Sequence, residues 1–584
     1  MNTDYINPDT VNSLHELLRL RSQKSPHGSA YQYFNRQTSH WDTIDWQSVY
    51  TQSRQWASAL AHEDLQAGDR VAILIKNSLE WVLFEQACFA NHLVVVPLYL
   101  EDRAENLAYV IQDAGVKLLL IEGDKHLEMI SSVAEKIDCL DKIICLDKPT
   151  IELTSINTAN LNTWLDKPEK HDLTDITDRH TLATIVYTSG TTGKSKGVML
   201  SHDNILQNTW AGLNSIKVYP SDNFLSFLPI SHMLERTVGY YMPMMSGALV
   251  SFSRSIPELA ADMVTLNPSV MITVPRIFER VYNKIEETIS QKPRLIQWLF
   301  ARSIDIAWDY FQYQQHKTGW SPLFILLPLF NLLFHRKIRD KFGKRFRFAI
   351  SGGAPLDYNV ARLFISLKII IAQGYGLTEF SPVISVNRLD DNDPRSVGRP
   401  LPGVEIRTNE NQELEVKGKC VMQGYWNNLE ATQVMIDEQG WLSTGDKVNI
   451  IDNRIYITGR IKDIIVLSTG EKVPPCEIEQ SILQDPAFEN IVVVGEQRPY
   501  LSALVIPNFD HVEKMVNDTD GFNEQLLERI NHKMSAFPGY ARIHKVSICK
   551  EAWTVENGML TPTLKPKRQY IIDQNKNIID DMYN

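Results

Sequence analysis

The sequence predicts an α/β protein with a large N-terminal domain of doubly wound sheets, a small β-rich subdomain and a smaller α+β domain at the C-terminus. Apolar, β-branched segments alternate with helical segments and short loops through the first two thirds of the chain, as is typical of parallel sheets. After Asp393-Pro394 the segments become short strands joined by turns, and beyond residue 460 strands and helices alternate again. At 584 residues the chain is too long for one core. We therefore expect an N-terminal domain at 1–459, including the β-rich subdomain at about 394–458, and a C-terminal domain at 460–584.

The N-terminal domain contains two rounds of this alternation. After a helix at 11–22, a strand-like pair at 30–34 and 40–44 and a helix from 46 to 63, strands are expected at 70–75, 94–97 and 117–122, separated by helices at 78–90 and 104–114. The second round has strands at 182–187, 270–274 and 348–350 and around residues 227, 250 and 370, with a helical insertion at 277–310. This order predicts parallel strands joined by helices.

The remaining expected elements are short. Strands at 404–408, 413–417 and 447–451 would form the β-rich subdomain. Further along, strands at 454–458, 463–467, 491–495 and 503–507 would alternate with helices at 476–483 and 522–537, and the boundary of the C-terminal domain is expected just after the first of these strands.

Composition excludes several classes of protein. Apolar content of 43% and charged content of 22% are ordinary for a soluble enzyme, and the net charge of −11 argues against nonspecific binding to nucleic acid or to anionic lipid through overall charge. The six cysteines contain no C-x-x-C pair, so we expect reduced thiols in a cytoplasmic protein and no zinc site. The first residues show no pattern of a signal peptide. The sequence carries no signal of oligomeric state.

One apolar window, at 322–334, is too short to span a bilayer and contains Pro328 and Asn331. A basic segment follows it at 335–345. Together, residues 322–345 could lie on a membrane surface, which would make the protein peripheral on the inner face of the membrane. A buried hairpin beside a solvated segment fits the sequence equally well.

The most distinctive stretch, at 187–202, reads Tyr-Thr-Ser-Gly-Thr-Thr-Gly-Lys-Ser-Lys-Gly-Val-Met-Leu-Ser-His. It lies between the strand at 182–187 and a helical segment at 205–213. Glycines allow tight turns that direct N–H groups inward, while hydroxyls add donors and lysines add positive charge, as polyphosphate binding requires. Only two residues separate Gly190 from Gly193, whereas a P-loop needs four. We therefore expect a phosphate-binding loop of another kind.

Seven further segments place polar side chains at strand ends or tight turns. Taken one at a time, each also fits an ordinary structural role, such as a hydrogen-bonded core histidine, a capped turn or a solvated tail. The segments are 228–236 with His232, 351–356 with Gly353 and Ala354, 373–379 with Tyr375 and Glu379, 442–446 with Asp446, 459–463 with Arg460, 468–472 with Gly470, and 560–568 with Lys565 and Lys567.

Taken in order, the loop together with Tyr-Gly-Leu-Thr-Glu (375–379), Ser-Thr-Gly-Asp (443–446) and Gly-Arg-Ile-Lys-Asp (459–463) resembles the adenylate-forming superfamily of acyl-CoA synthetases, nonribosomal peptide adenylation domains and luciferases. The resemblance covers essentially the whole chain. His-Met-Leu-Glu-Arg (232–236), Val-Pro-Arg-Ile-Phe-Glu-Arg-Val-Tyr (274–282) and Thr-Pro-Thr-Leu-Lys (561–565) are most similar to long-chain fatty-acid CoA ligases. This resemblance implies that ATP and a fatty acid give acyl-adenylate and pyrophosphate, and that CoA then displaces AMP.

The resemblance also implies roles for the matching residues. Lys565, His232 and Glu379 would be catalytic, Mg²⁺ would be held by Thr191 and Glu379, and the C-terminal domain would rotate between the two steps about Lys462. Gly470 and Glu471 would then face CoA. The residues implied to bind ATP or AMP are Thr188, Ser189, Gly190, Thr191, Thr192, Gly193, Lys194 and Lys196 at the phosphates, Gly353, Ala354 and Tyr375 at the adenine, Gly376 and Thr378 beside them, and Asp446 and Arg460 at the ribose.

Three alternatives remain open in the sequence. Leu564 stands where the superfamily usually has glycine, and Pro566 follows Lys565, so Lys567 competes with Lys565 as the lysine that bridges carboxylate and α-phosphate. The acyl group could also pass to a carrier protein instead of CoA. A catalytically inactive lipid-binding homologue is a third hypothesis, against which the intact Lys565, Glu379 and Asp446 argue.

Overall fold

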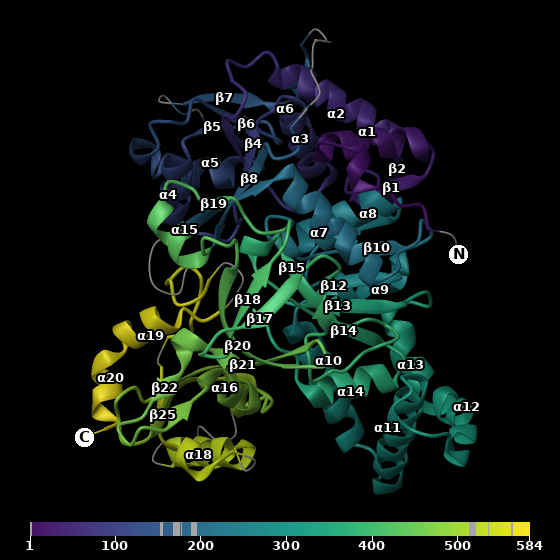
Figure 1. Cartoon of the computed structure of the whole chain (residues 1–584), viewed down its shortest axis with the longest axis vertical. Helices are drawn as coiled ribbons and strands as arrows, with labels where there is room; N and C mark the ends of the chain where they lie inside the picture. The colour runs from purple at the N-terminus through teal and green to yellow at the C-terminus, as the bar shows by residue number, and fades with distance from the viewer. Residues whose placement is uncertain are drawn as a thin grey trace.

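The computed structural model describes residues 3–151, 153, 156–167, 176, 178–188, 195–512, 521–534, 537–549, 551–561 and 565–583, except for the side chains of Lys462 and Asp510. Two large sheets with their helices occupy the upper and middle parts of the molecule in Figure 1. The C-terminal domain lies at the lower left and a helical lobe at the lower right. This architecture confirms the predicted α/β class, with a large N-terminal part and a smaller C-terminal one.

The eight-stranded sheet has the order β19-β9-β8-β4-β3-β5-β6-β7. Its strands from β8 to β7 pair in parallel, as the short loops predicted. The strands are β3 (Arg70–Leu74), β4 (Val94–Pro97), β5 (Val116–Ile121), β6 (Lys142–Cys145), β7 (Asn157–Asn160), β8 (Leu182–Thr188), β9 (Lys196–Ser201) and β19 (Gly424–Tyr425), and the helices are α2 (Trp46–Leu60), α3 (Leu79–Ala90), α4 (Ala104–Ala114), α5 (Asp124–Ser131) and α6 (Leu161–Leu165).

The segment after β8 differs from the expectation of a strand, a loop and then a helix. Lys196–Ser201 forms β9, which is antiparallel to β8, with Thr188 opposite Lys196. Val198 and Leu200 are fully buried, and Met199 between them is partly exposed, so these three side chains alternate as in a strand. The predicted phosphate-binding loop therefore connects the two strands of a hairpin, and its residues 189–194 lie outside the described residues.

The nine-stranded sheet has the order β16-β15-β14-β13-β12-β10-β11-β1-β2. It is parallel from β14 to β1 and antiparallel at both edges. The N-terminal strand pair joins this sheet, because Tyr31 pairs with Val250. The strands are β1 (Ser29–Asn35), β2 (His40–Asp45), β10 (Asn223–Ser226), β11 (Leu249–Phe252), β12 (Val270–Thr273), β13 (Phe348–Ser351), β14 (Ile370–Gly376), β15 (Val383–Val386) and β16 (Arg399–Pro400), and the helices include α1 (Leu14–Lys24), α7 (His202–Ser215), α8 (Met242–Ser246), α9 (Leu259–Leu266) and α14 (Tyr358–Ser366).

A buried ion pair links α3 to a π-helix, η3 (Glu235–Tyr241). Arg236 and Glu85 are both fully buried, and the Glu85 Oε1 atom also accepts the Tyr241 hydroxyl at 2.8 Å. A charge in such a core requires a partner, since an unpaired buried charge costs several kcal/mol. The pair therefore fixes the segment that begins three residues after His232.

A helical lobe, made of residues 275–342, projects from the nine-stranded sheet (Figure 1). Its apolar window forms one irregular helix that is neither wholly buried nor wholly exposed: Phe324 and Phe330 pack against Ile306, whereas several leucines face solvent. No helix in the described part of the chain is long and apolar enough to cross a membrane. The elements are α10 (Pro275–Ser290), α11 (Arg294–Gln314), η4 (Pro322–Leu326), α12 (Leu327–Phe330), η5 (Asn331–His335), α13 (Arg336–Arg339) and η6 (Asp340–Phe342).

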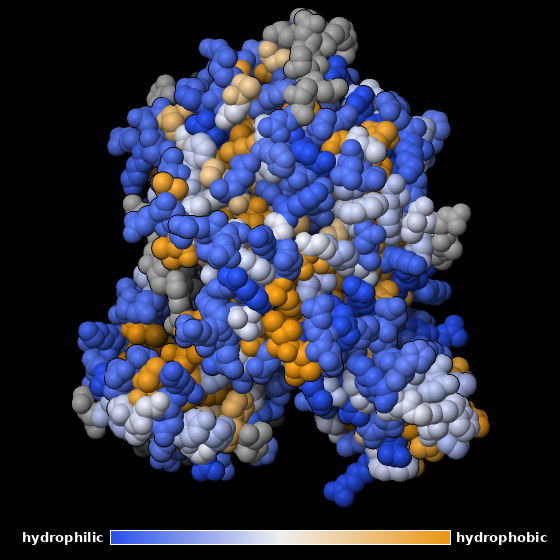
Figure 2. Space-filling view, in the orientation of Figure 1, coloured by the Kyte–Doolittle hydropathy of each residue, from blue (hydrophilic) through white to orange (hydrophobic). Residues whose placement is uncertain are grey.

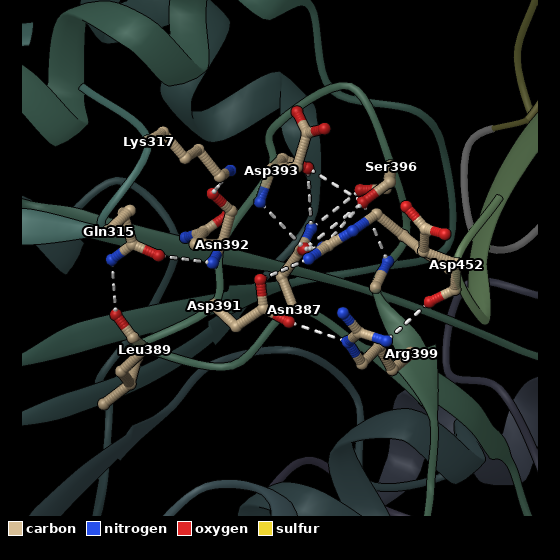
Figure 3. Close-up of polar contacts among 12 residues, drawn as sticks. Gln315, Lys317, Asn387, Leu389, Asp391, Asn392, Asp393, Ser396, Arg399 and Asp452 are labelled. Atoms are coloured by element: carbon tan, nitrogen blue, oxygen red, sulfur yellow. Dashed lines mark hydrogen bonds and ion pairs between the residues drawn. The ribbon is translucent and has the colours of Figure 1, made fainter. Parts of the chain in front are cut away.

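A polar loop at 387–399 joins this lobe to the β-rich sheet (Figure 3). Lys317 Nζ, just beyond α11, donates to the Asn392 carbonyl at 3.0 Å. Arg399 donates to Asp391 at 2.7 Å and to the Asp452 carbonyl at 2.5 Å. The loop thus holds the lobe and the β-rich sheet in a fixed relation.

The β-rich sheet has the order β17-β18-β20-β21 and is antiparallel. The C-terminal domain has a separate core around the sheet β24-β25-β26, whose last strand was not predicted. Of the strand predicted at 463–467 only β22 forms, because residues 461–463 make a 3₁₀ turn. The elements are β17 (Glu405–Thr408), β18 (Glu413–Lys417), α15 (Leu429–Met435), β20 (Leu442–Ile451), β21 (Arg454–Arg460), η8 (Ile461–Asp463), β22 (Ile465–Val466), β23 (Lys472–Val473), α16 (Pro475–Leu483), β24 (Phe488–Val494), β25 (Leu501–Pro507), α17 (Phe509–Val512), α18 (Phe522–Lys533), β26 (Ile543–Ile548), α19 (Arg568–Gln574) and α20 (Lys576–Asp581).

Candidate active site

The candidate site lies beyond the carboxyl ends of β10, β13 and β14, three parallel strands of the nine-stranded sheet. Ligands of open α/β sheets usually bind at this edge. The segment of His232 follows β10, the glycine-rich turn follows β13, and Tyr375 ends β14. Strands β20 and β21 and the segment of Lys565 close the site from the other side.

Tyr375, Asp446 and Arg460 form a connected polar chain. The Tyr375 hydroxyl donates to Asp446 Oδ2 at 2.5 Å, and Arg460 Nε donates to Oδ1 at 3.0 Å. Asp446 is buried and lies opposite Arg460 in the register of β20 and β21, whereas about half of the Arg460 side chain is exposed. Burial and the charge of Asp446 raise the pKa of Tyr375, so its hydroxyl remains a donor.

Two glycines beside these polar contacts differ in the space around them: Gly353 is open to solvent, whereas Gly376 is tightly packed. Gly353 and Ala354 are exposed, and Gly353 has φ of +80°, which favours glycine. A Cβ on Gly353 would meet no atom closer than 4.0 Å, so a flat ring can approach this turn. A Cβ on Gly376 would lie 1.9 Å from the Pro382 carbonyl oxygen, so only glycine fits there.

Tyr425 connects Glu379 to the phosphate-binding hairpin. Its hydroxyl donates to Glu379 Oε1 at 2.8 Å, and Lys196 Nζ lies 5.1 Å from the centre of its ring. Thr378 precedes Glu379 in the short 3₁₀ helix η7 (Thr378–Phe380). The carboxylate is thereby held near the end of the phosphate-binding loop.

Part of the predicted phosphate site can be placed. Thr188 and Lys196 lie at the ends of β8 and β9, where the loop leaves the sheet. The other residues predicted to bind phosphates are outside the described residues, and so is one of the two predicted magnesium ligands: Ser189, Gly190, Thr191, Thr192, Gly193 and Lys194.

Glu379 has the chemistry of a magnesium ligand beside a nucleotide. Among the described residues, no group of three or more His, Cys, Asp or Glu side chains could hold a metal ion, and the second Glu379 oxygen accepts no hydrogen bond. Mg²⁺ at nucleotide sites commonly takes one or two carboxylates, with substrate phosphates and water as its other ligands. A single carboxylate beside a phosphate-binding loop fits this pattern.

His232 is neutral at physiological pH. Its Nδ1 atom accepts the Leu234 N–H at 3.2 Å, which assigns the ring proton to Nε2. Burial, with a contribution from nearby Lys565, lowers the pKa of His232 to about 4. The ring can therefore donate an N–H to an anionic oxygen without changing its own protonation state.

The structure places Lys565, and not Lys567, beside Asp446 and Arg460. The Lys565 side chain is exposed to solvent, and its segment is held by hydrogen bonds in both directions with Thr561, of 2.8 and 3.0 Å. Partial desolvation and repulsion by Arg460 lower the pKa of Lys565 to about 8, although Asp446 opposes the shift. At neutral pH the ammonium is mostly charged.

Lys567 has different neighbours on the large domain. Its charge interacts with Arg103 and Asp102, which follow β4 and precede α4. Burial and repulsion by Arg103 lower its pKa. Lys567 thus contributes to the contact between the domains rather than to the cleft.

The predicted hinge and CoA residues lie in the C-terminal part. Lys462 is in η8, directly after β21. Gly470 is in the turn between β22 and β23, where its N–H donates to the Leu467 carbonyl at 2.9 Å, and Glu471 follows it. Among the described contacts, none connects this turn with Asp446 or Lys565.

Two sequence profiles account for most of the chain. One described as AMP-binding enzyme matches residues 18–426, and one described as AMP-binding enzyme C-terminal domain matches residues 462–584. The chain belongs to the AMP-binding enzyme family. Neither match covers residues 427–461, which contain β20 and β21 of the β-rich sheet. The second match begins at Lys462.

Relatives of this AMP-binding enzyme match over most of their own length. A long-chain-fatty-acid–CoA ligase of Mycobacterium bovis is 29% identical, with 93% of each chain covered. A chloroplastic long-chain-fatty-acid–[acyl-carrier-protein] ligase of Arabidopsis thaliana is 27% identical, covering 90% of this chain and 81% of that one. The fold matches the adenylation domain of carboxylic acid reductase from Segniliparus rugosus, solved with AMP and a carboxylic acid (TM-score 0.76, 19% identity, 98% and 94% coverage).

Tyr425 is the residue of the site that sequence reasoning missed. It lies on a two-residue strand and is 46 positions away from its partner Glu379. No motif spacing joins these two positions. The only signal was Gly-Tyr-Trp, an aromatic pair after a glycine, which by itself is typical of a surface strand.

Proposed function

We propose that this AMP-binding enzyme is a long-chain fatty-acid–CoA ligase that converts a fatty acid, ATP and CoA into acyl-CoA, AMP and pyrophosphate. The observation that carries the proposal is the position of Lys565, a residue of the C-terminal domain, beside Asp446, Arg460 and His232. The names of the relatives support fatty acids as the substrate class.

In the first step a fatty carboxylate oxygen would attack the α-phosphorus of ATP, and the bond from this phosphorus to the bridging oxygen of pyrophosphate would break. Two anions must approach each other, so positive charge is required between them. The Lys565 ammonium would bridge carboxylate and α-phosphate, while the His232 Nε2–H would donate to one of the anionic oxygens. Asp446 and Arg460 would exchange part of their contact with each other for contacts to the ribose.

In the second step the CoA thiolate would attack the acyl carbon, and AMP would leave. Lys565 has no role in this step, and its removal from the cleft would open a path to the adenylate. We propose that the C-terminal domain (460–584) rotates on the N-terminal domain (1–459) about Lys462 to expose Gly470 and Glu471 to CoA. Such a rotation of the C-terminal domain is consistent with a hinge that lies between two separately packed cores.

Magnesium belongs to the first step. We propose Glu379 as the protein carboxylate that holds it, with Tyr425 fixing the orientation of that carboxylate. The ion would neutralise phosphate charge when it is bound.

The test is a series of fatty acids of increasing length, each incubated with the enzyme, Mg·ATP and CoA. AMP release that depends on both the fatty acid and CoA, together with thioester formation, is expected. Pyrophosphate release without fatty acid would contradict the proposal, and no turnover with any carboxylate would favour the inactive lipid-binding homologue.

A carrier-protein ligase is the second candidate, favoured by the name of the Arabidopsis relative. Replacing CoA by acyl carrier protein that bears its phosphopantetheine arm distinguishes the two acceptors. We expect faster turnover with CoA. The reverse preference would assign the enzyme to carrier-protein loading.

We further propose a cytoplasmic location with peripheral contact to the inner face of the membrane through residues 322–345. Ten basic residues against three acidic ones at 292–345 support this contact. Fractionation of cells at low and high salt tests it, because electrostatic attachment weakens as salt screens the charges.

A further inference from the structure

Exposed apolar side chains concentrate on the helical lobe. Of the nineteen large apolar side chains that are exposed among the described residues, ten lie between positions 295 and 333. Figure 2 shows hydrophobic side chains at the outer edge of this lobe, and hydrophobic patches of this kind mark interaction sites. The ten are Leu295, Trp298, Tyr313, Trp320, Leu323, Ile325, Leu326, Leu329, Leu332 and Leu333.

The apolar window has two distinct faces. Phe324, Phe330 and Phe334 point inward and pack in the clusters around α11. The outer side chains recur every three or four residues, as on one side of a helix, and include Ile325 at 72% and Leu332 at 63% exposed. The helix therefore has apolar residues on both faces. Its inner face is covered by α11, whereas its outer face has no partner among the described residues.

Positively charged side chains lie next to the apolar outer face. Arg336 and Lys337 are exposed and follow Leu332 and Leu333 at the same helical spacing. Residues 275–342 contain eleven Lys and Arg against six Asp and Glu, a net charge of +5 in a chain whose net charge is −11. The lobe therefore opposes the charge of the rest of the molecule and is complementary to an anionic surface.

We propose that the outer face of the lobe docks on an anionic lipid bilayer. The docking face comprises the ten apolar side chains named above, with Arg336 and Lys337 at its rim. The leucines would enter the acyl boundary, Trp298 and Trp320 would lie at headgroup level, and the basic side chains would pair with lipid phosphates. This inference deepens the membrane contact proposed above and rests on the proposed function, because long fatty acids partition into bilayers.

The charge complementarity favours lipid over a second copy of the chain. A two-fold pairing of this face would bring two lobes of net charge +5 together, and like charges across an interface are unfavourable. A bilayer containing acidic lipids meets both the apolar and the cationic requirement.

The experiment uses the full chain with vesicles of phosphatidylcholine alone or mixed with phosphatidylglycerol, and measures co-sedimentation. Wild type is expected to bind the mixed vesicles more tightly. Leu329→Ser with Leu332→Ser should weaken binding about tenfold or more, because two leucines no longer leave water. The matched control, Leu429→Ser with Val434→Ser, changes side chains on α15 that are 71% and 80% exposed, and should bind as wild type does.

A second pair of variants tests the charges. Arg336→Glu with Lys337→Glu should remove the preference for phosphatidylglycerol, whereas Lys136→Glu with Lys576→Glu, two exposed positions outside the lobe, should largely preserve it. All variants should retain ATP- and CoA-dependent turnover of a short, water-soluble fatty acid without vesicles. This readout separates failure of docking from failure of the proposed ligase activity.

Two results would overturn the proposal. One is equal affinity of wild type and the leucine variant for mixed vesicles, including no binding by either. The other is a wild-type dimer that the leucine variant converts to monomer without any change in vesicle binding, which would assign the face to self-association.

Discussion

Lys565 is the residue whose setting most directly determines the chemistry. It stands next to one cation, Arg460, and one anion, Asp446, and neighbouring groups partly desolvate its ammonium. Desolvation and Arg460 favour the neutral amine, while Asp446 favours the ammonium. Lys565 is therefore charged at neutral pH, and a modest rise in pH is enough to remove its proton.

Replacement of Lys565 tests the assignment of the bridging lysine. Lys565→Ala should reduce the adenylation rate by on the order of a hundredfold to a thousandfold, as loss of a charge-stabilising donor typically does. Thioester formation from supplied acyl-adenylate should remain near the wild-type rate. Both half-reactions can be followed separately, by pyrophosphate release and by acyl-CoA appearance.

Lys567→Ala is the matched control, because it removes the same charge two residues away. Its side chain interacts with Asp102 and Arg103 outside the cleft, so adenylation should fall by less than about tenfold. If Lys567→Ala abolishes adenylation while Lys565→Ala does not, the assignment is wrong.

The pH dependence of adenylation follows from the same residue. The pKa of Lys565 is lowered to about 8, so the charged form prevails below pH 8 and is lost as pH rises through it. The kcat/KM for ATP, which reports the free enzyme, should therefore fall above pH 8. The break in kcat should lie higher, because bound ATP is anionic and favours the ammonium.

His232 should contribute no break near neutrality, since its pKa is about 4. A pH–rate profile of the first half-reaction from pH 6 to 10 measures these limits. A bell-shaped profile with an acid limb near pH 6.5 would contradict the neutral, donating role given to His232.

At the scale of elements, the hairpin of β8 and β9 and the short strand β19 determine where the phosphate-binding loop lies. β19 pairs with β9 through Tyr425 and Val198, and this pairing brings Tyr425 to Glu379. Burial and the Glu379 charge raise the pKa of Tyr425, so the hydroxyl is protonated and donates. The position of Glu379 is thus tied to the strand that anchors the loop.

Tyr425→Phe removes this donor and keeps the ring near Lys196. Loss of one hydrogen bond should raise the KM for Mg·ATP about three- to tenfold, with little change in stability. Tyr425→Ala also removes the buried ring and should have a larger effect on both KM and melting temperature. Initial rates at varied Mg·ATP, with thermal unfolding of each variant, measure this difference. An unchanged KM in Tyr425→Phe would contradict the link to Glu379.

Periodicity predicted the elements whose burial is uniform. The strands at 70–75 and 94–97 and the helix at 78–90 were located to within a residue or two, because each is an apolar run bounded by turns. β9 was missed since its loop chemistry obscured the alternation of Val198 and Leu200. β26 was missed because half of its residues are polar and only its pairing with β25 makes it a strand.

The residues of the candidate site were likewise only partly predictable from the sequence. Motif residues such as Tyr375, Asp446 and Arg460 were predicted to share a nucleotide site, and the fold places them in one chain of contacts. The choice between Lys565 and Lys567 could not be made from sequence. Two lysines separated by a single residue have the same local chemistry, and only the tertiary environment distinguishes them.

At the scale of the whole molecule, few contacts hold the C-terminal domain against the large one in this arrangement. Gln484 Nε2, at the end of α16, donates to Asp357 Oδ2 at 2.6 Å, and Arg276 of α10 donates to Asn490 of β24 at 3.3 Å. These are polar contacts of the kind found between domains that move. The arrangement has Lys565 beside Asp446 and Arg460, as the proposed first half-reaction would require.

A reversible link across this contact tests whether the second half-reaction needs another arrangement. Gln484→Cys with Asp357→Cys would be joined by a short thiol-reactive linker that dithiothreitol cleaves. With the domains linked, a single turnover of adenylation should proceed, because Lys565 stays in place. Acyl-CoA formation should fall at least tenfold, because the lysine and its domain cannot leave the cleft.

Each single cysteine variant treated with the linker is the control, and the Asp357→Cys variant also reports the loss of the cap that Asp357 provides to α14. Dithiothreitol should restore thioester formation in the double variant but change nothing in the single ones. Full thioester formation while the link is intact would show that both half-reactions take place in the arrangement observed here, so that the rotation about Lys462 is not required.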